Sequence, residues 1–318
     1  MRGIQVQSDH TILYKDDLPK PSASSSQLLV RVLSSPINPS DAMNASGKFP
    51  NTTFPRVPGR DFSGVVEQSS SSAFPVGTEV YGTSGPHLSF TIDGAAAEYV
   101  VAEADAVAVK PKSLSFAQAA AVGTPYTAAW LALSRAQAKA GETVLVLGSS
   151  GAVGSAVYQI AKKMGCQVIG AARRDNAEVD LRKDPKLETV SSLTGGAGAD
   201  ICVDAVGSTD IMPSELGALG LGGRMAIISA TGDPTLPINL RDLYRMNHVL
   251  VGCNTVATPA KVMADALAEM APWFDGGDLE APKESGLTEV KIEDFRKAYE
   301  DTIAGNAKGK KFVVSFNR

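Results

Sequence analysis

The sequence has little of the chemistry that metal centres and disulfide frameworks require. Its 318 residues contain only three histidines, scattered without the spacing of metal ligands, so we expect no metal site. Three cysteines, Cys166, Cys202 and Cys253, stand far apart inside apolar runs. Such thiols are more often buried and free than paired, which is typical of a reducing compartment.

Long apolar runs and a surplus of charge of one sign are also missing. No run reaches the length of a membrane helix, and the first ten residues lack the apolar core of a signal peptide. A net charge of −4 gives no electrostatic reason to bind nucleic acid. We therefore expect a cytoplasmic protein without a membrane or nucleic acid partner, long enough for two domains.

What is present is organised around the stretch from Thr143 to Gly154. Its first five residues are apolar or β-branched without alternation, which predicts a parallel strand buried on both faces. Glycines follow at positions 148, 151 and 154, and apolar residues then recur at steps of three and four as far as Met164, which predicts a helix. A β-rich run at 167–171 completes a βαβ unit.

Strand, glycine turn and helix together predict a dinucleotide-binding site. Glycine allows a sharp turn, a close approach of backbone amides to the pyrophosphate, and tight packing of helix on strand. The anion would lie at the helix N-terminus. The spacing is G-x-x-G-x-x-G rather than the commoner G-x-G-x-x-G. The expected cofactor contacts here are Gly148, Ser149, Ser150, Gly151, Ala152, Val153 and Gly154.

The end of the second strand of such a unit indicates which dinucleotide binds. An acidic residue there would bind the ribose 2′-hydroxyl, whereas arginine can hold a 2′-phosphate. Arg173 and Arg174 precede Asp175, which predicts NADPH rather than NADH, the alternative being a solvated basic loop. No clear apolar strand follows between Asp175 and Gly195, so we expect a reduced edge of the sheet.

The remaining pattern divides the chain into three segments. Residues 1 to about 112 contain short β-type runs and turns, and a helix from Ser115 to Val122 and another from about Tyr126 to Ala138 follow. Strands at 143–147, 167–171, 201–206, 224–229 and 249–253 then alternate with other segments. A helix and a closing strand at 311–316 follow residue 257. We expect an α/β protein, with a nucleotide domain at 124–256 inserted between two parts of a mostly β domain, 1–123 and 257–318.

Several blocks in this order resemble one family. They are Asn38-Pro39-Ser40-Asp41, Pro58 to Gly64, Ala97 to Val101, Gly123 to Trp130, the glycine turn, Asp204 to Gly207, and Gly309-Lys310. The chain resembles the medium-chain dehydrogenase/reductase superfamily, in its zinc-free quinone oxidoreductase and enoyl reductase branch, over essentially its whole length. The resemblance implies a GroES-like catalytic domain, a Rossmann-type domain with a parallel sheet, and an active-site cleft between them.

The resemblance also implies a reaction. Zinc-dependent relatives place a cysteine near the first block and a His-Glu pair near Gly59, where this chain has Asn38 and Arg60-Asp61. Without a Lewis acid, the favoured reaction is hydride transfer from NADPH to a quinone or to an activated C=C bond of an enone, enal or enoyl group. The alternatives are a zinc-free alcohol or aldehyde oxidoreductase and a non-catalytic NADPH-binding protein. The resemblance also implies a homodimer, in which strands such as Leu250 to Cys253 could pair across the two subunits.

The proton donor is left open by the sequence. Relatives often carry a tyrosine four or ten residues after the start of the first block, or close by, where this chain has Ala42-Met43 and Phe49. The catalytic candidates are Asn38, Tyr126 and Tyr81, with His87 or solvent as further proton sources. The expected substrate contacts are Asn38, Met43, Phe49 and His87, although Asn38 could simply hold its turn and His87 could lie in a surface loop. Further expected cofactor contacts are Thr127, Gly207, Ser229, Cys253 and Lys310.

Overall fold

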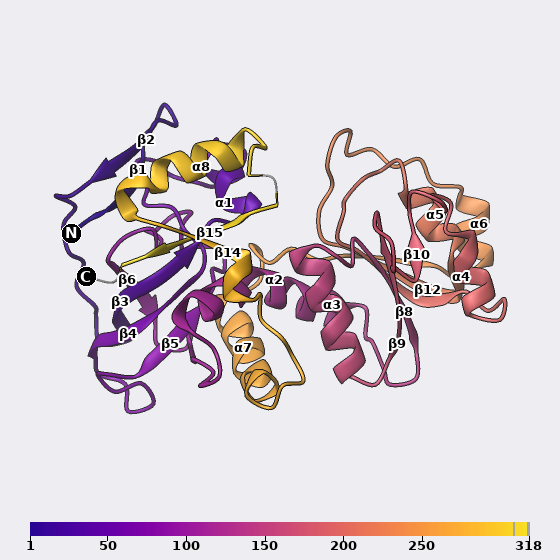
Figure 1. Cartoon of the computed structure of the whole chain (residues 1–318), viewed down its shortest axis with the longest axis horizontal. Coiled ribbons are helices and arrows are strands. Elements are labelled where there is room, and N and C mark those ends of the chain that lie inside the picture. The colour runs from indigo at the N-terminus through magenta and orange to yellow at the C-terminus, as the bar shows by residue number, and fades with distance from the viewer. Residues whose placement is uncertain (308, 317–318) are drawn as a thin grey trace. The chain divides into compact units, whose positions relative to one another are not determined.

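The computed structural model describes residues 1–307 and 309–316, and the chain forms two compact units (Figure 1). The first unit contains Met1–Thr124 and Thr255–Arg318, and the second contains Pro125–Asn254. The second unit is therefore inserted in the sequence of the first. The α/β fold class expected from the alternating pattern is confirmed.

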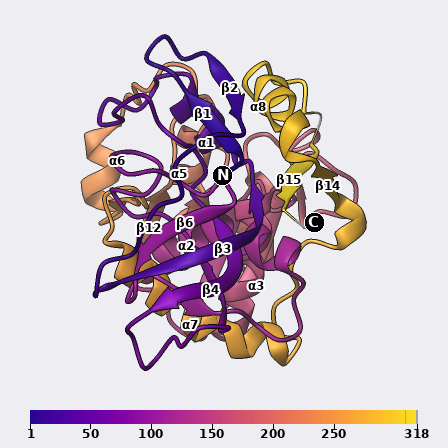
Figure 2. The same ribbon diagram turned by 90° about the vertical axis from the view of Figure 1, so that its left-hand side faces the viewer.

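A seven-stranded sheet forms the centre of the first unit. Its strand order is β14-β15-β3-β4-β5-β7, and β6 pairs with β3. All pairs are antiparallel except β14 with β15. The strands are β3 (Gln27–Pro36), β4 (Phe62–Ser69), β5 (Glu79–Gly82), β6 (Tyr99–Glu103), β7 (Ala108–Val109), β14 (Leu287–Val290) and β15 (Lys311–Ser315). Figure 2 shows β3 between β4 and β6.

Helices and a hairpin complete the core of the first unit. The hairpin joins β1 (Gly3–Val6) to β2 (Ile12–Lys15), and α8 (Phe295–Ile303) lies beside β2 and α1 (Pro39–Ala45) (Figure 1). The helix α7 (Ala260–Asp275) packs against β5 and β7. Two 3-10 turns, Glu284–Gly286 and Ile292–Asp294, flank β14. Alternation along β3, β4 and β15 sends their apolar side chains into one core with those of the hairpin and α8.

The sheet of the second unit has six parallel strands in the order β10-β9-β8-β11-β12-β13. These strands are β8 (Thr143–Leu147), β9 (Gln167–Ala172), β10 (Val179–Asp180), β11 (Ala199–Asp204), β12 (Leu219–Ile227) and β13 (Val249–Gly252). The central strand β8 is buried from Val144 to Leu147, as its unbroken apolar run predicts. The edge strand β10 has only two residues, which confirms the expected reduction of that edge.

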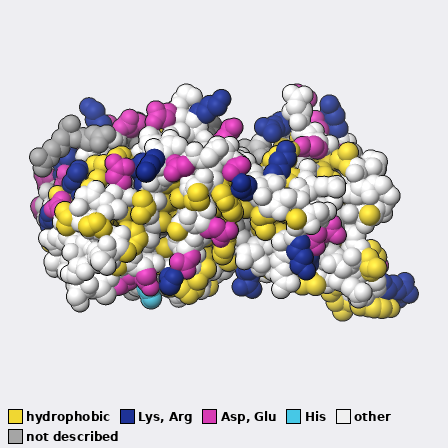
Figure 3. Space-filling view, turned by 90° about the horizontal axis from the view of Figure 1, so that it is seen from below, with side chains coloured by type: hydrophobic (Ala, Val, Ile, Leu, Met, Phe, Trp, Pro, Cys, Tyr) yellow, Lys and Arg dark blue, Asp and Glu magenta, His cyan; other side chains and the backbone are white. Residues whose placement is uncertain are grey.

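Helices cover both faces of this parallel sheet. The helix α3 (Ala152–Lys163) lies on one face, and α4 (Glu188–Leu193) and α5 (Met212–Gly217) lie on the other (Figure 1). A short helix, α6 (Leu240–Arg245), precedes β13. No helix within the described residues is long and apolar enough to cross a membrane. On the face shown in Figure 3, acidic and basic side chains are interspersed.

One helix, α2 (Phe116–Arg135), replaces the two helices expected from the sequence. The expected interruption at residues 123–125 was wrong, because the helix continues through Pro125. Asp61 receives hydrogen bonds from the backbone N–H and the hydroxyl of Thr124, at 2.9 and 2.7 Å. A Cβ on Gly123 would lie 2.7 Å from the Asp61 carboxyl carbon, so glycine permits this approach. The Gly-Thr-Pro block thus joins α2 to Asp61 and does not end the helix.

Candidate functional site

The carboxyl ends of five strands meet at one edge of the parallel sheet. Leu147 of β8 lies opposite Ala171 of β9 and Asp204 of β11, and Ile227 of β12 lies opposite Asp204 and Gly252 of β13. Ligands of open α/β sheets bind at this edge, at the point where the strand order reverses. Residues expected to bind the cofactor follow these strand ends directly: the 148–154 turn, Arg173, Arg174, Gly207, Ser229 and Cys253.

The glycine turn after β8 has the geometry of an anion cradle. Gly148 has a φ of +72°, and its N–H and that of Ser149 donate to the Ala171 carbonyl oxygen at 2.9 and 3.2 Å. A Cβ on Gly154 would lie 2.1 Å from the Gly148 carbonyl oxygen, so only glycine lets α3 pack this closely. Ser150, Gly151 and Ala152 are exposed at the N-terminus of α3. The Gly151 N–H donates to the Gly148 carbonyl oxygen at 2.8 Å, and the N–H groups of the first helical turn lack intrahelical partners. The turn therefore fits a dinucleotide pyrophosphate.

Further turns at the same edge bring Gly207 beside Ser229. Gly207 has a φ of +73° and donates its N–H to Asp204 Oδ1 at 2.9 Å. A Cβ on Gly207 would lie 2.6 Å from the Ser229 hydroxyl oxygen. Cys253 follows β13 and is buried, and burial raises the pKa of its thiol. Thr127 is fully buried on α2, in the second unit but outside these turns.

Arg173 and Arg174 directly follow β9 and are both exposed. Within the described residues, neither guanidinium has a hydrogen bond or an ion pair. Asp175, the next residue, is held by Arg182, with Nη2 of the arginine 2.6 Å from Oδ1 of the carboxylate. At the end of β9 the two arginines therefore present to a ligand guanidiniums that have no partner among the described residues.

In the first unit, Asn38 belongs to a polar cluster with Asp41, Asp61 and Lys311. Its side-chain N–H₂ donates to Asp61 Oδ2 at 2.7 Å and to Asp41 Oδ2 at 3.0 Å, and its Oδ1 accepts from Lys311 Nζ at 3.2 Å. Burial, with the nearby charge of Asp61, raises the pKa of Asp41 to about 6. Partial burial of Lys311 lowers the pKa of its ammonium, against the attraction of both carboxylates. Both ends of the Asn38 amide are engaged inside this cluster.

The buried guanidinium of Arg60 contacts three hydroxyl groups. Its Nε donates to Ser84 Oγ at 2.7 Å, Nη1 to Ser40 Oγ at 2.9 Å and Nη2 to Thr255 Oγ1 at 3.0 Å. Its backbone N–H donates to Asp41 at 3.1 Å. Arg60 thus places a fixed positive charge beside the Asn38 cluster. Within the described residues, no group of three or more His, Cys, Asp or Glu side chains could hold a metal ion.

The two candidate tyrosines have different surroundings. Tyr81 is fully buried, and its hydroxyl donates to the Leu267 carbonyl oxygen of α7 at 2.7 Å. Burial raises the pKa of this phenol well above its ordinary value. Tyr126 lies on α2, where its hydroxyl oxygen accepts from Gln159 Nε2 of α3 at 3.1 Å. The Tyr81 hydroxyl therefore joins β5 to α7, whereas Tyr126 links two helices of the second unit.

Three expected substrate contacts lie in loops or helices of the first unit. Phe49 packs on Phe90 with ring centroids 5.5 Å apart, and His87 is exposed beside Thr91, with Nδ1 3.1 Å from Oγ1. Both therefore adjoin the 87–91 loop. Met43 projects from α1 and is 45% exposed.

Sequence reasoning missed two cations: Lys311, which lies in the Asn38 cluster, and Arg182, which binds Asp175. It named Lys310, which is exposed just before β15, whereas the neighbouring Lys311 enters the Asn38 cluster. The alternation of the closing strand could have indicated this, since Lys311 shares a face with Val313. Arg182 was also missed, because its link to Asp175 depends on how the loop after β9 folds.

Two family models match this chain. The alcohol dehydrogenase GroES-like domain matches residues 24–112, and the zinc-binding dehydrogenase model matches residues 152–272. An alcohol dehydrogenase superfamily protein from Novosphingobium aromaticivorans has the same fold, with a TM-score of 0.88, 24% identity and full coverage of both chains.

Curated relatives extend over nearly the whole chain. A zinc-type alcohol dehydrogenase-like protein of Schizosaccharomyces pombe is 39% identical over 321 residues, covering 99% of this chain and 93% of its own. Human quinone oxidoreductase is 28% identical over 332 residues, covering 99% and 97%. The 2-methylene-furan-3-one reductase of Solanum lycopersicum is 37% identical over 194 residues, covering 58% and 46%.

Proposed function

Since the chain belongs to the medium-chain dehydrogenase/reductase superfamily, we propose that it is an NADPH-dependent reductase of quinones or of C=C bonds conjugated to a carbonyl. Enones, enals and enoyl groups are the proposed C=C substrates. The similarity to a human quinone oxidoreductase and to a furanone reductase of Solanum lycopersicum supports this substrate class. Membership of the family makes the protein an oxidoreductase that uses a pyridine nucleotide.

The observation that carries the proposal is the sheet edge of the second unit. The glycine turn at 148–154 offers an anion site at the N-terminus of α3, and Gly207 and Ser229 adjoin each other at a neighbouring strand end. Arg173 and Arg174 add two exposed guanidiniums at the end of β9. Guanidinium groups bind phosphate through paired, charge-assisted hydrogen bonds, which favours the 2′-phosphate of NADPH over the bare hydroxyl of NADH.

NADPH would supply the hydride, and the chain would hold it and provide the proton that completes the reduction. In this proposal the 148–154 turn holds the pyrophosphate, and Arg173 and Arg174 hold the 2′-phosphate. The Tyr81 hydroxyl donates its hydrogen bond to the Leu267 carbonyl oxygen, so Tyr126 or solvent is the proposed proton source. Phe49 and Met43 offer apolar surface to a substrate.

The proposal that zinc takes no part depends on residue types. A catalytic zinc is usually bound by three Cys, His or carboxylate side chains, with an open fourth position. Here Asn38 and Asp61 are hydrogen-bonded to each other, and Arg60 places a cation next to them. A guanidinium at this point disfavours a divalent cation by like-charge repulsion.

The test is oxidation of NADPH by the purified protein after dialysis against a chelator. Quinones, enones, enals and enoyl thioesters would be offered in turn, with NADH in parallel and with alcohols plus NADP⁺ as the reverse assay. Turnover of a conjugated acceptor that survives chelation supports the proposal. Loss of turnover on chelation, or oxidation of alcohols alone, contradicts it. Tight NADPH binding without turnover of any acceptor would identify a binding protein.

We also propose a homodimer that forms through β13. This strand is an edge of the six-stranded sheet, and its Val249 and Leu250 side chains are 49% and 37% exposed. An exposed apolar edge strand can pair with another chain, because its outward N–H and C=O groups are unpaired. The three cysteines are buried and free, which supports the proposed cytoplasmic location.

A further inference from the structure

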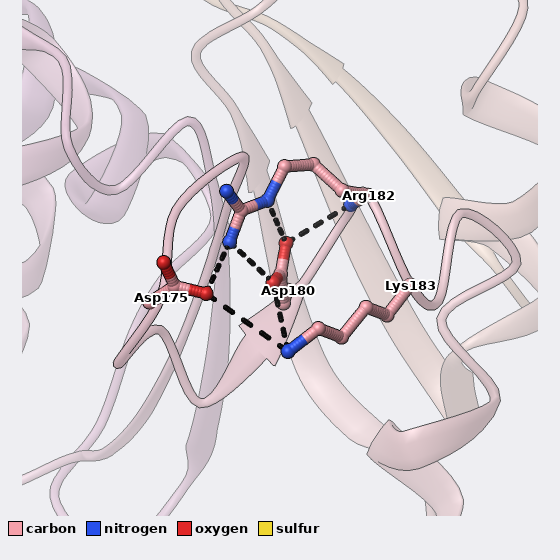
Figure 4. Close-up of polar contacts among 4 residues, drawn as sticks. All are labelled: Asp175, Asp180, Arg182 and Lys183. Carbon is pink, nitrogen blue, oxygen red and sulfur yellow. Dashed lines mark hydrogen bonds and ion pairs between the residues drawn. The ribbon is translucent and has the colours of Figure 1, made fainter.

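Asp175, the acidic residue that follows β9, forms ion pairs with cations of its own loop. Asp175 Oδ1 lies 2.6 Å from Arg182 Nη2 and 3.9 Å from Lys183 Nζ (Figure 4). Both cations come from the turn that follows β10. An acid at this point of a βαβ unit ordinarily accepts a hydrogen bond from the ribose 2′-hydroxyl. In this loop the carboxylate faces a guanidinium of its own chain.

Arg182 is itself fixed by Asp180. The Asp180 carboxylate accepts from Arg182 Nε at 2.9 Å, from Nη2 at 2.7 Å and from the Arg182 backbone N–H at 3.1 Å. These hydrogen bonds lower the pKa of Asp180 below its ordinary range. The same Nη2 group donates to Asp175, as Figure 4 shows. Asp180 therefore orients the guanidinium that holds Asp175.

The remaining charges of the 173–183 segment leave two arginines unpaired. Glu178, its third acid, accepts from the Tyr158 hydroxyl at 2.7 Å and from the Gly170 N–H at 3.2 Å. Every acid of this segment thus has a partner, whereas Arg173 and Arg174 have none within the described part of the chain. The acids of this segment are thus engaged by donors of the same unit, whereas the guanidiniums of Arg173 and Arg174 remain open to a ligand.

We propose that Arg182 is a positioning residue that sets cofactor choice through Asp175. By holding and neutralising the Asp175 carboxylate, Arg182 prevents it from repelling a 2′-phosphate and from accepting a bond from a 2′-hydroxyl. This role adds to the proposed grip of Arg173 and Arg174, and it rests on the proposed preference for NADPH. Without Arg182, the carboxylate beside these arginines would act as an NADH determinant.

The test measures dissociation constants for NADPH and NADH by calorimetry, without turnover. The four proteins are the wild type, Arg182→Gln, Asp175→Asn and the double variant. We expect Arg182→Gln to weaken NADPH binding about tenfold, because the freed Asp175 carboxylate would repel the 2′-phosphate. The same variant should bind NADH more tightly, because the carboxylate could then accept a hydrogen bond from the 2′-hydroxyl. Asp175→Asn alone should change little, and in the Arg182→Gln background it should restore most of the NADPH affinity.

The double variant separates positioning from direct contact. If NADPH affinity stays low in the double variant, Arg182 binds the phosphate itself or only shapes the loop, and the proposal is overturned. Lys183→Gln is the matched control, since Lys183 approaches the same carboxylates at 3.7 and 3.9 Å and should have a smaller effect. Thermal unfolding of each variant reports whether the loop variants fold.

The wild-type measurements separate this inference from the proposed function. A wild type that binds NADH as tightly as NADPH overturns the proposed cofactor preference and with it the role of Arg182. A wild type that prefers NADPH, with a preference that Arg182→Gln leaves unchanged, overturns only the role of Arg182.

Discussion

The Lys311 ammonium donates to Asn38 Oδ1 at 3.2 Å, while the amide nitrogen of the same side chain donates to Asp61 and Asp41. Asn38 thus connects one cation to two buried carboxylates. Asp61 in turn binds Thr83 and Thr124, so the cluster ties β15, α1, β4 and the N-terminal part of α2 together. If Asn38 binds substrate, its amide must do so while it keeps its hydrogen bonds to Asp41, Asp61 and Lys311.

Lys311→Met should destabilise the protein by about 3 kcal/mol, since it leaves two buried carboxylates without their nearest ammonium. The loss should depend on pH. The folded-state pKa of Asp41 is about 6, above its ordinary value, so Asp41 takes up a proton more readily when folded than when unfolded. Without Lys311 this pKa rises further, so the deficit should be larger at about pH 8 than at about pH 5.

Urea unfolding of wild type and variant at the two pH values measures this difference. The matched control is Lys310→Met, which removes the same charge from the exposed neighbouring side chain. We expect a change within about 0.5 kcal/mol for the control. Equal losses in both variants would contradict the role given to Lys311.

Arg173→Ala combined with Arg174→Ala should raise the Kd for NADPH by about a hundredfold or more and leave the Kd for NADH within about twofold. The reason is that two charge-assisted contacts to a phosphate are removed, each worth about 1.5 kcal/mol or more. Isothermal titration calorimetry measures both constants. Arg241→Ala with Arg245→Ala, on the exposed surface of α6, removes the same charge from the same unit and serves as control. A similar loss for both pairs would indicate a long-range effect of net charge.

Much of the fold could be predicted because its buried strands have strong local patterns. The run Thr143 to Leu147 is apolar throughout and forms β8 with the expected bounds. The hairpin of β1 and β2 was missed, because Gly3–Val6 and Ile12–Lys15 are short and mix polar with apolar residues. Such strands form through long-range packing, which local patterns do not encode. The same reason explains α2, whose passage through Pro125 depends on hydrogen bonds from Thr124 to Asp61.

The candidate site could be predicted to a different degree in the two units. In the second unit the cofactor candidates follow strand ends, and parallel pairing alone brings strand ends together. In the first unit the candidates come from α1, β5 and loops whose arrangement depends on tertiary contacts. Tyr81 is an example: alternation along β5 predicts a buried side chain, but not that its hydroxyl meets Leu267 of α7.

Glu215→Gln should stabilise the protein at alkaline pH. Both carboxyl oxygens of Glu215 are buried without a hydrogen-bond partner in the described residues, and burial raises its pKa to about 9. The folded state therefore retains a proton that the unfolded chain loses near pH 4.5. Wild-type stability should fall as pH rises from about 4.5 to about 9, by at most about 1.4 kcal/mol per pH unit, and the variant should lack this decline.

Urea unfolding of wild type and Glu215→Gln across this pH range checks the prediction. The difference between the two proteins isolates Glu215 from other titrating groups such as Asp41. Glu188→Gln, at an exposed position of α4, is the control and should follow the wild-type pH profile. Parallel wild-type and Glu215→Gln profiles would show that Glu215 is ionised at neutral pH in the folded state.

Leu250→Lys should convert the proposed dimer to a monomer. Leu250 lies within β13, the edge strand of the parallel sheet. If two β13 strands pair about a two-fold axis, each chain contributes one lysine at this position, and the two like charges repel. Size-exclusion chromatography with light scattering should give the mass of two chains for the wild type and of one chain, 33.1 kDa, for the variant. Leu193→Lys, a substitution of a leucine on α4 that is more exposed than Leu250 (51% against 37%), should leave the mass at two chains. A wild type that already has the mass of one chain would refute the dimer, and a Leu250→Lys variant that stays dimeric would place its interface away from β13.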